Sequence, residues 1–201
     1  MTGINVSSDQ GIVDWNAVKY NPHFRSEYAY IKISEGVDII DPQRALNSKN
    51  AISSGIKIGY YHHASLSSLD VLKDSSDGAE YFMKSVTLLP KADLPPAVCV
   101  NSNKMALTKN EMCKWIGNFI KIVQKSYPNI VLYSDPAFLN ENLHERHGLG
   151  NIPLWIAQYT ANVAPHLPAG WSDYFMWEYS IKGRINGISG NVGLNRMKTT
   201  L

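Results

Sequence analysis

The residues best placed for chemistry lie where short apolar runs end in polar side chains. Residues 94–103 begin with Leu94 and a Pro-Pro pair, continue as a small apolar run, and present Cys99 and Asn101 toward their end. This pattern predicts a buried strand, and in barrels of parallel strands the chemistry sits at the carboxyl ends of the strands. A carboxamide cannot donate a proton near neutral pH, and a thiol with a pKa of about 8.5 carries little negative charge there. The segment therefore predicts a site position that lacks a carboxylate.

Two carboxylates accompany other predicted strands. Glu35 follows the apolar run at 28–33, and Glu178 lies inside the aromatic run at 174–179. If both face one groove, they could act as an acid and a base or nucleophile on a glycosidic bond. Asp135 and His62 are weaker candidates for the same chemistry.

The composition excludes several classes of protein. The 201 residues are 44% hydrophobic and 18% charged, which is enough for one domain, 1–201, with a sizeable core. A net charge of +2 is too small to indicate nucleic-acid or membrane binding, and no apolar run approaches the roughly 18 to 20 residues of a membrane span. Residues 1–6 lack the features of a signal peptide, so we expect synthesis in a cytoplasm.

The two cysteines predict neither a disulfide framework nor a metal site. Cys99 and Cys113 are accompanied by no CxxC or HxxxH spacing. We expect two reduced thiols, no bound metal and no cofactor, since no Gly-rich phosphate loop follows the first strand either.

The order of the predicted elements favours an irregular, TIM-like β/α barrel. Strands alternate with helical patterns over the first two thirds, which indicates parallel βα units, whereas the last third is poor in helices. Helices are expected to begin at Asp14, to span 43–54, to pass through 79–83 after a polar loop at 66–77, and to follow a capping box at Thr108. Strands are expected at 3–6, 28–33, 56–61, 94–103, 129–133, 153–159, 174–179 and 184–188.

Four segments together resemble the lysozymes of glycoside hydrolase family 25, the Chalaropsis-type N-acetylmuramidases. They are G-I-N-V-S-S-D-Q-G at 3–11 with the following Asp14-Trp15, I-K-I-S-E-G at 31–36, L-W-I-A-Q-Y at 154–159, and W-E-Y-S at 177–180 with G-I-S-G-N at 187–191. Their order and spacing cover nearly the whole chain. The resemblance implies a barrel whose glycan groove lies at the carboxyl ends of the strands.

The sequence departs from the family where the family carries its acids. The family pattern G-I-D-V-S has Asn5 at its acidic position, and the D-x-E pattern of the fourth strand is occupied by Cys99 and Asn101. The pattern V-D-x-N near the C-terminus has Gly193 in place of its acid. Glu35 remains, and Glu178 stands where many members have Gln.

These departures predict a lysozyme-like, peptidoglycan-directed domain without the family's catalytic residues. Such a domain would bind peptidoglycan or a related glycan, or serve as a structural module, for example with virion or tail proteins of a phage. The alternative is an active, divergent muramidase that cleaves β-1,4 bonds with Glu35 and Glu178.

Aromatic side chains near strand ends extend the prediction of a glycan-binding groove. Sugar faces carry C–H groups that pack on aromatic rings, and hydroxyl groups need polar partners. Alternation along a strand turns about half of such rings into the barrel core instead. The predicted binding residues are Glu35, Tyr61, Tyr133, Trp155, Gln158 and Trp177.

Overall fold

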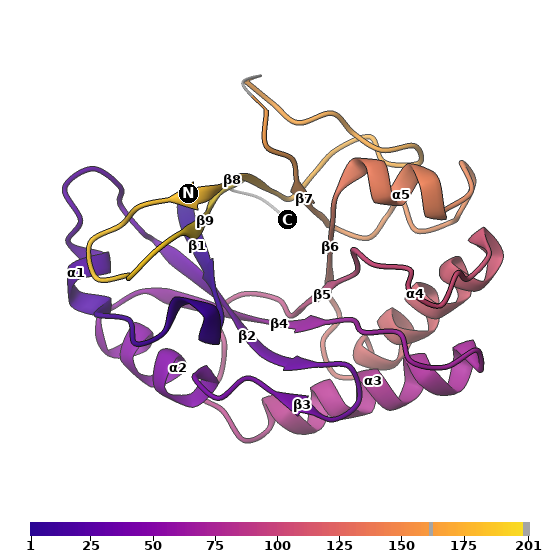
Figure 1. Cartoon of the computed structure of the whole chain (residues 1–201), viewed down its shortest axis with the longest axis horizontal. Helices are drawn as coiled ribbons and strands as arrows, with labels where there is room; N and C mark the ends of the chain where they lie inside the picture. The colour runs from indigo at the N-terminus through magenta and orange to yellow at the C-terminus, as the bar shows by residue number, and fades with distance from the viewer. Residues whose placement is uncertain (161–162, 199–201) are drawn as a thin grey trace.

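The computed structural model describes residues 1–160 and 163–198. Nine strands in these residues form one sheet, in the order β1-β9-β8-β7-β6-β5-β4-β2-β3, and pairing of β1 with β2 closes it. The strands are β1 (Thr2–Val6), β2 (Tyr28–Glu35), β3 (Ile39–Ile40), β4 (Lys57–His63), β5 (Ala97–Cys99), β6 (Val131–Ser134), β7 (Leu154–Ala157), β8 (Met176–Gly183) and β9 (Val192–Met197). The closed barrel confirms the predicted fold class (Figure 1).

Strand direction follows the predicted division of the chain. The pairings from β1 through β2, β4, β5, β6 and β7 to β8 are parallel. The short β3 pairs antiparallel with the end of β2, outside the barrel. In the last third, β9 runs antiparallel between β8 and β1 and completes the barrel without an intervening helix.

The barrel is flanked by helices on its outside (Figure 1). These are α1 (Trp15–Lys19), α2 (Arg44–Ser53), α3 (Val71–Val86), α4 (Lys109–Val123) and α5 (Pro136–Asn142), with a short 3-10 helix η1 at Ser8–Gln10. The capping box at Thr108 is confirmed, because its backbone N–H donates to Glu111 Oε2 and its hydroxyl oxygen accepts from the Glu111 N–H. None of these helices is long and apolar enough to cross a membrane.

Two expected element boundaries are wrong. The helix α3 begins at Val71, inside the polar stretch expected to be a loop, because Asp70 caps it and its small polar residues pack against α4. Asp74 is one of them, and its Oδ2 accepts a hydrogen bond of 2.7 Å from the buried Trp115 Nε1. The last strand is Val192–Met197 rather than 184–188, where Gly187 adopts a φ of +92° and its carbonyl accepts from the Asp14 N–H.

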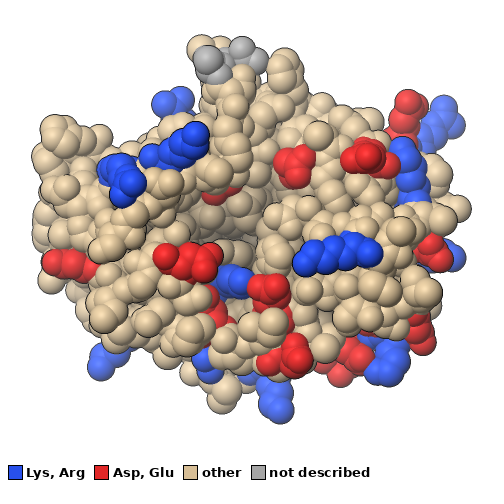
Figure 2. Space-filling view, in the orientation of Figure 1, with Lys and Arg blue, Asp and Glu red and all other residues tan. Residues whose placement is uncertain are grey.

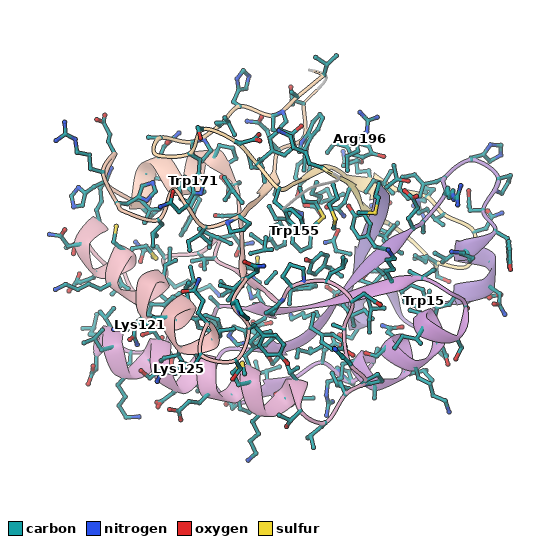
Figure 3. The ribbon with its side chains drawn as sticks, turned by 180° about the vertical axis from the view of Figure 1, so that it is seen from behind. Trp15, Lys121, Lys125, Trp155, Trp171 and Arg196 are labelled. Carbon is teal, nitrogen blue, oxygen red and sulfur yellow. The ribbon has the colours of Figure 1, made fainter. Side chains whose placement is uncertain are left out.

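Large rings fill the inside of the barrel. Every second residue of each strand points into the barrel. The Tyr30 ring lies so close to Gly59 on the neighbouring strand β4 that a Cβ on Gly59 would come within 2.5 Å of the ring. Trp155 lies near the centre of the molecule (Figure 3). The interior cluster comprises Tyr28, Tyr30, Tyr61, Ala97, Cys99, Val131, Trp155, Phe175, Met176 and Met197. A second, larger cluster packs the barrel wall against the helices.

Candidate active site

The candidate site lies where the carboxyl ends of the parallel strands meet the start of β9. In the pairing register, Gly193 of β9 faces Asn5 of β1, and Asn195 faces Glu178 of β8. Figure 2 shows a hollow near the middle of the visible face, with charged side chains of both signs close to it. A cavity of about 200 Å³ in this region is lined by Cys99, Asn101, Tyr133, Ser134, Asp135, Ala157 and Tyr159.

A larger cavity lies at the opposite end of the strands. Its volume is about 580 Å³, and it is bordered by Tyr60, the loop before β5 and the loop before β6. It contains none of the predicted site residues. Its size alone therefore does not make it the site.

The four positions that are acidic in the family pattern hold no carboxylate. Asn5 Oδ1 accepts a hydrogen bond of 2.7 Å from Asn195 Nδ2, and Asn101 Oδ1 lies 3.1 Å from His63 Nε2. Cys99 is buried, and burial together with the nearby Glu178 raises the pKa of its thiol. Gly193 contributes only backbone. A neutral thiol and two carboxamides supply neither a proton nor a negative charge at neutral pH.

Glu35 is an ionised carboxylate at the end of β2. Lys32 Nζ donates to its Oε2 at 2.6 Å, and His63 Nδ1 lies 3.7 Å from its Oε1. Burial opposes ionisation, but the hydrogen bond and charge of Lys32, helped by His63 and Lys104, outweigh it and lower the pKa of Glu35. The carboxylate is therefore unsuited to donate a proton.

Glu178 has the opposite environment. Its side chain is 1% exposed, and its Oε2 accepts hydrogen bonds from the hydroxyls of Tyr133 at 2.9 Å and Tyr159 at 2.8 Å. Its Oε1 is buried without a full hydrogen bond in the described residues. Burial raises the pKa of Glu178, and the tyrosine hydroxyls and the weaker contact with the Asn5 amide offset this only in part.

The predicted binding aromatics occupy different depths. Tyr133 is half-buried on the cavity wall, and its ring stacks on Trp155 with centroids 3.9 Å apart. Tyr61 is 7% exposed and meets Trp155 edge to face. Trp155 and Trp177 are buried, so neither presents an open ring face to a ligand in this conformation.

Gln158 follows the end of β7. Its side-chain Oε1 accepts a hydrogen bond from the backbone N–H of His166, and its backbone carbonyl accepts one from Trp177 Nε1. Tyr159, the next residue, is 53% exposed and lines the cavity. The exposed ring at this edge of the groove is therefore that of Tyr159.

Two residues of the site, Asn195 and Lys32, are not among those predicted from the sequence. Asn195 is fully buried and joins Trp155 Nε1 to Asn5, while Lys32 neutralises Glu35. The position of Asn195 in the V-G-L-N segment was the available signal, because a polar residue two positions from Gly193 shares its face of the strand. In residues 1–160 and 163–198, no three His, Cys, Asp or Glu side chains are grouped to hold a metal ion.

Fold, groove and sequence define the class of this protein. The chain belongs to the glycosyl hydrolases family 25, whose model matches residues 4–188. The resemblance stated from the sequence is thereby confirmed, and the fold is that of the lysozymes in this family.

Individual relatives support the same assignment. The chain is 30% identical over 204 residues to "Lysozyme M1" of Streptomyces globisporus and 29% identical over 195 residues to the "Autolytic lysozyme" of Clostridium acetobutylicum. These alignments cover 96% and 97% of this chain. The crystal structure of a bacterial lysozyme from Streptomyces coelicolor superposes with a TM-score of 0.86 at 27% identity, over 100% of this chain and 93% of that chain.

The two curated relatives are longer proteins. This chain spans 66% of the length of the first and 55% of the length of the second. The organisation as one domain, 1–201, remains a prediction.

Proposed function

We propose that this domain binds peptidoglycan or a related glycan in the groove at the carboxyl ends of its strands, without hydrolysing it through the family's carboxylates. The observation that carries the proposal is Asn101. It stands at the position of the family's acid, its amide is engaged with His63, and it has no proton to give. Loss of a general acid typically lowers a rate by about 10² to 10⁴-fold.

The groove retains groups suited to binding a sugar. Tyr159 offers a half-exposed ring that can pack against the C–H face of a pyranose, as aromatic rings do in ligand sites. Asp135, Asn101 and the Tyr133 hydroxyl line the same cavity and can bond with sugar hydroxyls or an N-acetyl group. The lysozyme names of the relatives favour peptidoglycan as the source of that glycan.

The experiment separates binding from cleavage. Purified protein is sedimented with peptidoglycan sacculi, and soluble muropeptides are measured by chromatography beside an active family 25 lysozyme. We expect saturable binding and no muropeptide release above the blank. Tyr159→Ala should weaken binding, whereas Tyr20→Ala, at a residue that is 80% exposed outside the groove, should not. Release by the wild type at a rate comparable to the active lysozyme would overturn the proposal.

The divergent muramidase is the second candidate, and the opposite pKa shifts of Glu35 and Glu178 favour it. A carboxyl with a raised pKa and one with a lowered pKa are what an acid and its partner need. Against it, Glu178 is covered and both hydroxyl contacts fall on one oxygen. This candidate requires muropeptide release that Glu35→Gln and Glu178→Gln each abolish. A folded wild-type protein that neither binds nor cleaves sacculi would favour a structural module, such as a virion or tail component.

A further inference from the structure

Two departures from the family pattern, Glu178 and Gly193, lie in direct contact. They stand on the neighbouring strands β8 and β9. A Cβ built on Gly193 would lie 2.3 Å from Glu178 Oε1 and 2.0 Å from Asn5 Oδ1, far inside van der Waals contact. The Glu178 carboxyl thus occupies space that any side chain at position 193 would need. A glutamate here and a residue larger than glycine at 193 exclude each other in this arrangement.

The Glu178 carboxyl does not line the cavity itself. It is 1% exposed and touches the cavity only through Tyr133 and Tyr159, which do line it. Both hydroxyls donate their single proton to Glu178 Oε2. A tyrosine hydroxyl whose hydrogen already points at Glu178 can still accept a hydrogen bond through the lone pairs of its oxygen, but it cannot donate a second one.

We propose that Glu178 supplies, from β8, a carboxyl group in the space beside position 193, where the family pattern has an acidic residue, and that it positions Tyr133 and Tyr159 as hydrogen-bond acceptors for the ligand. The groups recognised would be donors, namely sugar hydroxyls or the N–H of an N-acetyl group. This inference rests on the proposed function for its ligand, while the exchange between positions 178 and 193 rests on the packing alone. Glu178 acts as a positioning residue.

Glutamine is the matched substitution at position 178. It has nearly the same shape as glutamate, and the family resemblance places Gln at this position, so the Glu178→Gln variant should fold. Its amide oxygen can also accept from both tyrosine hydroxyls, but a neutral amide oxygen is a weaker acceptor than a carboxylate oxygen, so the variant holds the two hydroxyls less firmly. A less firmly held hydroxyl turns more readily toward the cavity, where its own proton would face the donor group of a ligand.

Binding is measured by calorimetry with a β-1,4-linked tetrasaccharide prepared from purified peptidoglycan. We expect Glu178→Gln to weaken binding roughly tenfold, the size expected for one or two impaired hydrogen bonds. Tyr159→Phe should weaken it similarly, and the double variant should be little weaker than either, because one acts through the other. Glu80→Gln on the exposed side of α3 and Tyr20→Phe are the controls and should bind as the wild type does.

Unchanged binding by Glu178→Gln would overturn the positioning role, as would additive losses in the double variant. A wild type that does not bind the tetrasaccharide overturns the proposed function and the choice of ligand together.

Thermal unfolding separately tests whether the Glu178 side chain occupies the space that a side chain at position 193 would need. Gly193→Ala should lower the melting temperature of the wild type and of Glu178→Gln, which keeps the bulk at position 178. Its effect should be smaller in a Glu178→Ala background, where one of the two obstructing side chains is gone. The same loss in all three backgrounds would overturn the exchange, whatever the binding data show.

Discussion

Two carboxyl groups at the carboxyl ends of the strands are held in different ways. On the side of β2, β4 and β5, Glu35 is partly exposed and is paired with Lys32, and His63 Nδ1 lies 3.7 Å from its Oε1. On the side of β8, β9 and β1, Glu178 is covered and held by tyrosine hydroxyls, next to the Asn5–Asn195–Trp155 hydrogen bonds. The first side carries an ion pair that is partly exposed to solvent, whereas the carboxyl of the second side is buried away from any cation.

The difference shows that the environment, more than the residue type, decides what a carboxyl group can do. A cation within hydrogen-bond distance keeps Glu35 ionised, whereas burial without a cation favours the protonated form of Glu178. The lowered pKa of Glu35 and the burial of Glu178 both weigh against a proton donor at these positions.

Restoring the family's carboxylates should change the chemistry most. We expect the triple variant Asn5→Asp, Cys99→Asp and Asn101→Glu to release muropeptides at least about 10²-fold faster than the wild type, since a general acid alone contributes about 10² to 10⁴-fold. Chromatography of digested sacculi measures the release. The variant Asn5→Asp with Cys99→Asp, which lacks the restored acid, is the matched control and should remain inactive. A folded but inactive triple variant would mean that the groove differs from an active one at more than these three positions.

Substitutions on the buried side, formed by β8, β9 and β1, should lower the stability far more than substitutions on the partly exposed side, formed by β2, β4 and β5. Trp155 is fully buried, stacks on Tyr133 and donates to Asn195, so Trp155→Ala should cost about 3 to 5 kcal/mol in free energy of unfolding. His63→Ala, at the rim of the other side, should cost about 1 kcal/mol or less. Urea denaturation of both variants measures the difference. Equal losses in free energy of unfolding would contradict the distinction between a buried side and a partly exposed side.

Burial of His62 should make the stability of the fold depend on pH. His62 points outward from β4, stacks on Phe119, and has its pKa lowered to about 3, mainly by burial. The folded state therefore binds this proton less readily than the unfolded chain, whose His pKa is about 6.5. The stability contributed by neutral His62 is present above pH 6.5 and is lost as the pH falls from 6.5 toward 3, by at most about 1.4 kcal/mol per pH unit.

The corresponding experiment is urea denaturation between pH 7.5 and 4.5. The His62→Gln variant keeps a group that can bond with Ser34 but cannot titrate, so its stability should fall less steeply with acid than that of the wild type. His23→Gln, at an exposed loop position, should follow the wild type. Parallel curves for wild type and His62→Gln would show that another group dominates the acid sensitivity.

Much of the fold could be predicted because its signals are local. The helix at Lys109–Val123 has its cap, its capping box and its apolar stripe in adjacent residues. The final strand was misplaced because Val192–Met197 holds a glycine and two polar residues, and its burial comes from β1 and β8 on either side rather than from its own composition. Neighbours that are distant in sequence thus overrode local propensity.

The site was predictable as a set of positions but not as a set of contacts. Motif order indicated that Asn5, Cys99 and Asn101 belong together at the strand ends. No spacing in the sequence indicates that Glu178 enters the space beside Gly193. Nor does it indicate that Lys32 pairs with Glu35 three residues further along β2, where the register with β4 shifts between Lys32 and Ser34. Such contacts depend on side-chain depth inside the barrel, which alternation alone leaves undetermined.

The smallest effect should come from Glu35→Gln, and its dependence on conditions distinguishes the two carboxyls. The ion pair with Lys32 is partly hydrated, so its loss should cost about 0 to 1 kcal/mol in free energy of unfolding at low salt and less at high salt. Because the pKa of Glu35 is lowered, its contribution is present above the unfolded value of about 4.3 and is lost as the pH falls through the lower folded value. Glu178→Gln should show the opposite sign: a carboxyl with a raised pKa disfavours the folded state as the pH rises through that value, so the variant should gain stability at neutral pH and lose the gain in acid. Asp77→Asn, which breaks the more exposed Lys73 pair, is the control with the smallest expected change. Urea denaturation at pH 7.5 and pH 4, each at low and high salt, would contradict the contrast between the two sides if Glu35→Gln and Glu178→Gln changed stability in the same direction.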